Sequence, residues 1–91
     1  MNIQRLRNLT TGILHTTMSD VYADIEWLVG VKGIMTHMLP SACRALEPWL
    51  RQKLSDQRLF DSQYDPLHVG DTPINPMDSY EQGEFWKRYG T

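Results

Sequence analysis

The chain has 91 residues, a formal net charge of −2, a hydrophobic fraction of 41% and a charged fraction of 22%. This length is enough for one domain with a single modest core and too short for two. The composition excludes wholesale disorder, and so small a net charge excludes both a DNA mimic and a strong nonspecific binder of nucleic acid.

Charge divides the chain into unequal parts that we expect to form one domain. Residues 1–54 hold six Lys and Arg against four Asp and Glu, whereas residues 55–91 hold three against seven. We therefore predict a compact body over 1–54, an extended acidic arm over 55–76 and an aromatic C-terminal helix over 77–91. The single cysteine, Cys43, permits no internal disulfide. No apolar run has the length of a signal peptide or of a membrane span, so we expect a cytoplasmic protein with no membrane partner.

Residues 1–18 predict a β-hairpin. Two short apolar runs, 6–9 and 13–18, flank Thr10-Thr11-Gly12, where glycine favours a tight turn. The alternation is imperfect because Ile13 and Leu14 are adjacent. An N-terminal helix is the alternative.

The next segment predicts a helix over about residues 20–29. Thr17 or Ser19 is suited to cap its start, and Gly30 is suited to end it in the left-handed conformation. Residues 30–33 then form a loop, in which two glycines flank a lysine. The apolar stripe that we expect to be buried consists of Val21, Tyr22, Ile25, Leu28 and Val29.

A second helix, from Pro40 to about Leu54, is the element around which we expect the rest of the chain to pack. Proline suits the first helical position. Pro48 lies in the helix interior, where it predicts a kink near 44–47 or two short helices, and a concave bend there favours docking. The predicted buried stripe is Ala42, Ala45, Leu46, Trp49, Leu50 and Leu54.

The C-terminal part predicts an arm held on the surface and a short helix. The anchors that we predict for the arm are Phe60, Tyr64, Leu67 and Val69. Asp78 and Glu81 have the spacing of a capping box, which predicts a helix over about 77–89 that ends at Gly90.

Together these elements predict an α+β fold, with a short N-terminal hairpin packed on two main helices, an irregular arm and a short C-terminal helix. An all-α fold is the alternative. An exposed hairpin edge can pair across a two-fold axis, so a homodimer is an expected assembly.

The sequence gives no support for catalysis or for a bound metal or cofactor. His15, His37 and His68 are separated by 22 and 31 residues, without the close ligand pairs that are typical of zinc sites. No nucleophile and base occur in a recognisable arrangement, and no nucleic-acid-binding motif is present. We therefore expect a protein that is not an enzyme, needs no cofactor and does not bind nucleic acid directly.

The aromatic content indicates a contact surface instead. Nine aromatic residues, three of them Trp, are many for so small a core. Trp, Tyr and Arg dominate the energetics of protein interfaces. The candidate interface residues are Trp86, Tyr89, Arg88, Lys87 and Trp27.

Three short motifs resemble a known group of proteins. Leu9-Thr10-Thr11-Gly12, Thr36-His37-Met38-Leu39-Pro40 and Pro48-Trp49-Leu50 are similar to segments of small proteins of unknown function encoded by tailed phages and prophages. The resemblance covers about residues 8–52 and carries no activity or functional residue.

This resemblance implies an accessory phage protein. We expect it to bind and inhibit a protein complex in the cytoplasm of the host cell, such as a defence nuclease or a CRISPR effector. The alternative is a binder of a small ligand or signalling nucleotide, with the arginines of the body as phosphate ligands. A third hypothesis is a regulator that binds nucleic acid.

Overall fold

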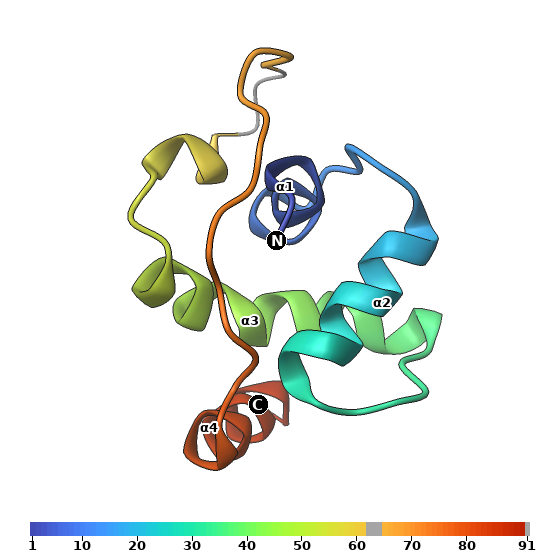
Figure 1. Ribbon diagram of the computed structural model, residues 1–91. Coiled ribbons are helices and arrows are strands. Elements are labelled where there is room, and N and C mark those ends of the chain that lie inside the picture. Colours follow the sequence, from blue (N-terminus) through green and yellow to red (C-terminus); the bar gives the residue numbers. More distant parts are fainter. Residues whose placement is uncertain (62–64, 91) are drawn as a thin grey trace.

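The computed structural model describes residues 1–61 and 65–90, and this part of the chain is all-α, with four α-helices and no β-strand (Figure 1). The helices are α1 (Ile3–Thr11), α2 (Met18–Val29), α3 (Leu39–Lys53) and α4 (Ser79–Tyr89), and two 3-10 turns are η1 (Thr36–Met38) and η2 (Gln57–Phe60). The prediction of an α+β fold was therefore wrong, and its all-α alternative was right. None of the described helices is long and apolar enough to cross a membrane.

The predicted N-terminal hairpin is replaced by α1. The Asn2 side chain caps this helix by accepting hydrogen bonds from the backbone N–H groups of Gln4 (2.9 Å) and Arg5 (3.2 Å). Gly12 ends the helix with a φ of +72°, so the glycine predicted to form a hairpin turn is a helix C-cap instead. Because this segment is a helix, it has no strand edge through which the predicted homodimer could pair. The buried apolar face of α1 consists of Ile3, Leu6 and Leu9.

The two main helices follow the sequence prediction closely. Thr17 caps α2 through a hydrogen bond from the N–H of Asp20, and Gly30 ends it with a φ of +80°. The predicted stripe of α2 is buried, with Tyr22 only partly so. All predicted apolar positions of α3 are buried, including Leu54 immediately after its end. Pro48 lies inside α3, which is one helix across the proline rather than two short ones.

Residues 65–78 form a strap, which starts with a turn at 66–67 and then runs past α1 to α4 (Figure 1). It is joined to the N-terminus, because the backbone N–H of Thr72 donates to the carbonyl of Met1 at 2.8 Å and the Met1 ammonium donates back to the Thr72 carbonyl at 2.8 Å. At its other end the N–H of Met77 donates to the carbonyl of Leu28 at 2.8 Å. These backbone contacts hold the strap against the helices at both of its ends.

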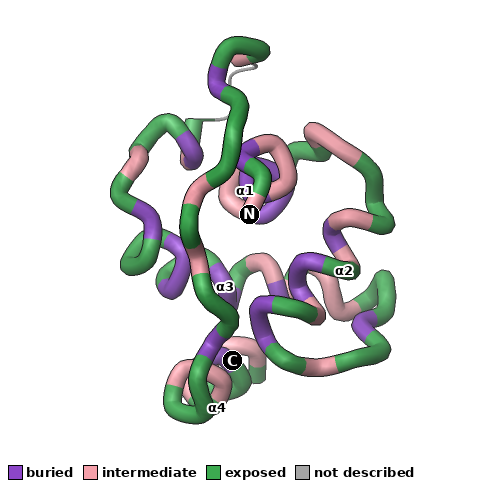
Figure 2. Tube along the Cα trace, in the orientation of Figure 1, coloured by how far each residue is buried: buried purple, intermediate pink, exposed green. Residues whose placement is uncertain are grey.

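The residues that anchor the strap differ from those predicted. Leu67 and Val69 point outward and are 89% and 63% exposed, so these predicted anchors were wrong. The strap is buried instead at His68 and Met77, which are isolated buried positions along an otherwise accessible segment (Figure 2). Of the other predicted anchors, Phe60 packs against the core and Tyr64 lies outside the described residues.

A polar network holds His68 in place. The guanidinium of Arg7, itself fully buried, lies 3.2 Å from Nδ1 of His68, and Nε2 of His68 lies 2.9 Å from a carboxylate oxygen of Asp56. Arginine can only donate, so Nδ1 accepts and the proton sits on Nε2, which donates to Asp56. Hydrogen bonds from Arg58 are the main cause that lowers the pKa of Asp56 to about 2. The network therefore joins α1, η2 and the strap.

The terminal helix packs on α3. Asp78 and Glu81 form the predicted capping box, in which each side chain accepts a hydrogen bond from the backbone N–H of the other residue. Phe85 is completely buried between the two helices and the core. The capping box and this single buried aromatic ring fix α4 at the end of the strap.

Candidate functional site

An apolar groove opens where three helices meet. It lies between the end of α1, the loop that follows, the start of α2 and the start of α3, and it has a volume of about 280 Å³. Two of the motifs found in the sequence, 9–12 and 36–40, come together here. We call this site the apolar groove; its lining residues are Asn8, Gly12, Leu14, Met18, Val21, Leu39, Pro40 and Cys43.

Asn8 builds the wall of the groove by fixing the loop between α1 and α2. Its side chain is 4% exposed, and its Oδ1 atom accepts hydrogen bonds from the backbone N–H groups of His15 (2.6 Å) and Thr16 (3.1 Å). Its Nδ2 atom donates to Oγ1 of Thr16 at 2.7 Å. The fixed loop presents Ile13 and Leu14 to solvent, where they are 47% and 51% exposed. Of these two side chains, Leu14 lines the groove and Ile13 does not.

The chemistry of the apolar groove suits binding rather than catalysis. None of its eight lining residues carries a charge. Burial raises the pKa of the Cys43 thiol, which keeps it protonated and a poor nucleophile. The groove therefore offers an apolar surface with one polar side chain, Asn8, which is the usual composition of a small-molecule site.

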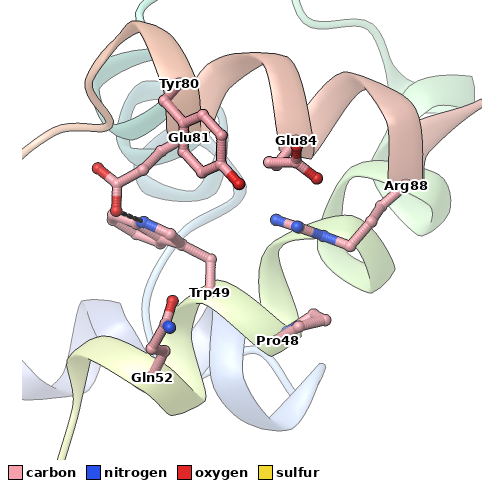
Figure 3. Close-up of a pocket in the computed structure, with 7 residues that line it drawn as sticks. All are labelled: Pro48, Trp49, Gln52, Tyr80, Glu81, Glu84 and Arg88. Atoms are coloured by element: carbon pink, nitrogen blue, oxygen red, sulfur yellow. Dashed lines mark hydrogen bonds between the residues drawn. The ribbon is translucent and has the colours of Figure 1, made fainter.

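A second, more polar groove of about 370 Å³ lies between α3 and α4. Figure 3 shows Tyr80, Glu84 and Arg88 of α4 turned toward one another above α3. We call it the α3–α4 groove; its lining residues are Pro48, Trp49, Gln52, Tyr80, Glu81, Glu84 and Arg88.

The charged groups of the α3–α4 groove mainly hold its two helices together. A carboxylate oxygen of Glu81 accepts hydrogen bonds from Lys53 Nζ at 2.9 Å and from Trp49 Nε1 at 2.7 Å. The Lys53 ammonium is the first cause that lowers the pKa of Glu81 to about 2, so this carboxylate stays ionised. On the other side of the groove Arg88 Nε donates to the carbonyl of Ala45 at 2.8 Å. Both groups thus fasten α4 to α3.

The predicted interface residues do not form one surface. Trp86 and Tyr89 pack edge to face, with ring centroids 5.2 Å apart, and Trp86 keeps 37% of its surface exposed. Lys87 is exposed and pairs with a carboxylate one turn away, whereas Arg88 lines the α3–α4 groove. Trp27 lies on α2 and lines a separate shallow groove near the N-terminus. The structure therefore groups the α4 residues and leaves Trp27 apart from them.

Three of the four arginines of the body are used in structural contacts, and the fourth, Arg44, is exposed. Arg5 forms a bidentate ion pair with buried Asp24, at 2.9 and 2.6 Å. Arg7 is buried in the His68 network, and Arg51 pairs with Glu47 and lies 4.4 Å from the centre of the Phe60 ring. These contacts weaken the hypothesis that the arginines bind the phosphates of a nucleotide.

The loop at residues 30–33 also lacks the features of an anion site. A carboxylate oxygen of Glu26 accepts hydrogen bonds from the backbone N–H groups of Gly33 (2.7 Å) and Ile34 (3.2 Å). The donors that would bind an anion there are thus taken by a side chain of the protein itself. Among the described residues no group of three or more His, Cys, Asp or Glu is placed to hold a metal ion.

Sequence reasoning did not single out the apolar groove. Asn8, Leu14 and Met18 carry no catalytic or metal-binding signature, and the groove forms only when the ends of three helices pack together. The adjacent Ile13 and Leu14, which did not fit the hairpin pattern, were the one signal available.

Comparison with known proteins places the chain in a family. Residues 1–58 match the domain of unknown function DUF7736, and because this match covers more than half of the sequence, the chain belongs to that family. No curated protein and no solved structure matches the chain. Every lining residue of the apolar groove lies within the matched region, whereas four of those of the α3–α4 groove lie beyond it.

Proposed function

We propose that this member of the DUF7736 family is a non-catalytic protein that binds a small ligand in the apolar groove. The observation that carries this proposal is the pairing of an apolar groove of about 280 Å³ with a wall fixed by the buried Asn8 side chain. Small-molecule sites are mostly apolar, are largely pre-formed in the unbound protein and contain few polar groups. The location of the whole groove within the family match supports a role common to this domain.

The contacts of the charged residues favour this function over nucleotide sequestration. A nucleotide brings several phosphate charges, which proteins bind with Arg, Lys or helix ends. Arg5, Arg7 and Arg51 are instead engaged in structural contacts. An apolar ligand needs no such cluster.

The test is retention of a small molecule from a cell extract. The tagged protein is incubated with an extract of the cells in which it occurs and desalted, and the bound compounds are released and identified by mass spectrometry. Leu14→Asp places a charge in the groove wall, and Ile13→Asp is the matched control, because Ile13 has similar exposure and does not line the groove. We expect a compound that the wild type and Ile13→Asp retain and Leu14→Asp does not. Retention of no compound by the wild type, or equal retention by Leu14→Asp, contradicts the proposal.

A second candidate function is inhibition of a host protein complex by a phage accessory protein, such as a blocker of a defence nuclease or CRISPR effector. The observation in its favour is the surface of α4, where Tyr80 is 76% exposed and Trp86 is partly exposed. Exposed Tyr and Trp beside a groove are typical of protein interfaces.

This second candidate is tested by affinity capture from a host lysate. Tyr80→Ala is the test variant and Trp27→Ala the control, since Trp27 lies on another surface. Stoichiometric capture of one complex by the wild type and Trp27→Ala, and its loss with Tyr80→Ala, would support inhibition through α4. Capture that Tyr80→Ala leaves unchanged would exclude this interface.

A further inference from the structure

The lining of the apolar groove restricts the charge of its ligand. Apart from Asn8 and Gly12, it consists of five apolar side chains and the protonated thiol of Cys43. An ionised group that enters this surface loses hydration and meets no opposite charge among the lining residues. The groove therefore discriminates against charged ligands.

Asn8 restricts the polar group that the ligand carries. Its Oδ1 atom already accepts two backbone N–H groups, which uses both lone pairs of the amide oxygen. Its amide nitrogen has two N–H groups, of which one donates to Thr16 Oγ1. The remaining capacity of the side chain is one hydrogen-bond donor, which is complementary to an acceptor on the ligand.

The start of α2 acts in the same direction. α2 begins at Met18, which lines the groove, whereas η1 directly precedes α3 and the Leu39 N–H already donates to the Thr36 carbonyl. The N-terminal end of a helix carries a partial positive charge, which attracts an acceptor and repels a cation. Asp20 in the first turn of α2 offsets part of this positive charge. The helix end is therefore too weakly positive to pair with an anion.

We infer that the ligand of the apolar groove is a short neutral aliphatic molecule with one carbonyl group, which accepts a hydrogen bond from the Asn8 amide. This inference rests on the proposed function and assigns the chemical class of the ligand. The volume of about 280 Å³ is close to the lower limit of typical ligand pockets, about 300 Å³, and so favours a short chain.

The test compares three probes with the same six-carbon chain and different charge: hexanamide, hexanoate and hexylammonium. Each is titrated at pH 7 into isotope-labelled protein, while the methyl resonances of Leu14, Val21 and Leu39 and the side-chain amide resonances of Asn8 are followed by NMR. We expect hexanamide to bind at least about tenfold more tightly than either charged probe, because only the charged probes bury an unpaired ion. We also expect the Asn8 amide resonances to shift together with the methyl resonances.

Leu14→Asp and Ile13→Asp again serve as the test and control variants. Loss of the hexanamide shifts in Leu14→Asp, with retention in Ile13→Asp, assigns the binding to the groove. If hexanoate or hexylammonium binds as tightly as hexanamide, or if the Asn8 resonances stay still while the methyl resonances move, the assigned ligand class is wrong and the proposed function stands. If no probe shifts any groove methyl resonance, the proposed function fails as well.

Discussion

The side chain of Asn8 should contribute to stability out of proportion to its size. Asn8→Ala removes three hydrogen bonds that hold the α1–α2 loop, two to backbone N–H groups and one to Thr16. At about 1 kcal/mol each, the expected loss in the free energy of unfolding is about 2–3 kcal/mol. For a domain of this size that corresponds to a fall in Tm of roughly 10–20 °C.

The assay combines thermal unfolding by circular dichroism with hydrogen exchange of single amides. Asn8→Ala should speed the exchange of the His15 and Thr16 amides, which lose their acceptor. Asn2→Ala is the matched control, since it removes the cap of the same helix for about 1 kcal/mol and leaves the loop intact. A loss below about 0.5 kcal/mol in Asn8→Ala, with unchanged exchange at both amides, would refute the account of the groove wall.

Three further predictions concern the rest of the fold. Arg7→Met should lower the free energy of unfolding by about 3 kcal/mol in urea titrations, because it leaves the buried Nδ1 atom of His68 without its donor at 3.2 Å and removes the hydrogen bond to the Asp61 carbonyl at 2.8 Å. An effect below about 1 kcal/mol would contradict this. Gly30→Ala should lower the free energy of unfolding by about 1–2 kcal/mol, since φ is +80° and the new Cβ would lie 2.6 Å from Nε2 of Gln82. An unchanged Tm would show that the helix end adjusts to alanine without strain. The pKa values of Asp56 and Glu81 are lowered to about 2, below their ordinary values of 3.8 and 4.5. The two ionised carboxylates therefore stabilise the fold fully above about pH 5, and this contribution is lost as the pH falls toward 2. Equal Tm values at pH 5 and pH 3 would contradict this prediction.

Much of the helical architecture follows from local sequence signals. Thr17 and Gly30 delimit α2, and the capping box of Asp78 and Glu81 starts α4. These signals are short-range, since a cap and an apolar stripe act within one or two turns. They could therefore be recognised before any tertiary contact was known.

The N-terminal segment shows where local signals are ambiguous. A Thr-Thr-Gly segment suits a hairpin turn and also the end of a helix, because glycine accepts a positive φ in both. The deciding features were the Asn2 cap and the spacing of Leu6 and Leu9, which place them on the buried face of α1. Packing of this face on the core overrode the strand preference of the threonines.

The strap and the apolar groove depend on contacts between distant segments. A turn at 66–67, closed by the hydrogen bond from the His68 N–H to the Asp65 carbonyl at 3.2 Å, leaves Leu67 exposed beside the buried His68. Histidine is buried here because Arg7 and Asp56 satisfy both of its ring nitrogens, which no local pattern reveals. The groove likewise requires the ends of three helices to meet.

Cys43 offers a direct test of whether a ligand occupies the apolar groove. Cys43 is the only cysteine and lines the groove, so the rate at which a neutral thiol reagent modifies it reports on occupancy. We expect hexanamide to slow this reaction in a saturable manner in the wild type and in Ile13→Asp, and to have no effect in Leu14→Asp. A rate that saturating hexanamide leaves unchanged in the wild type would contradict ligand binding in the groove.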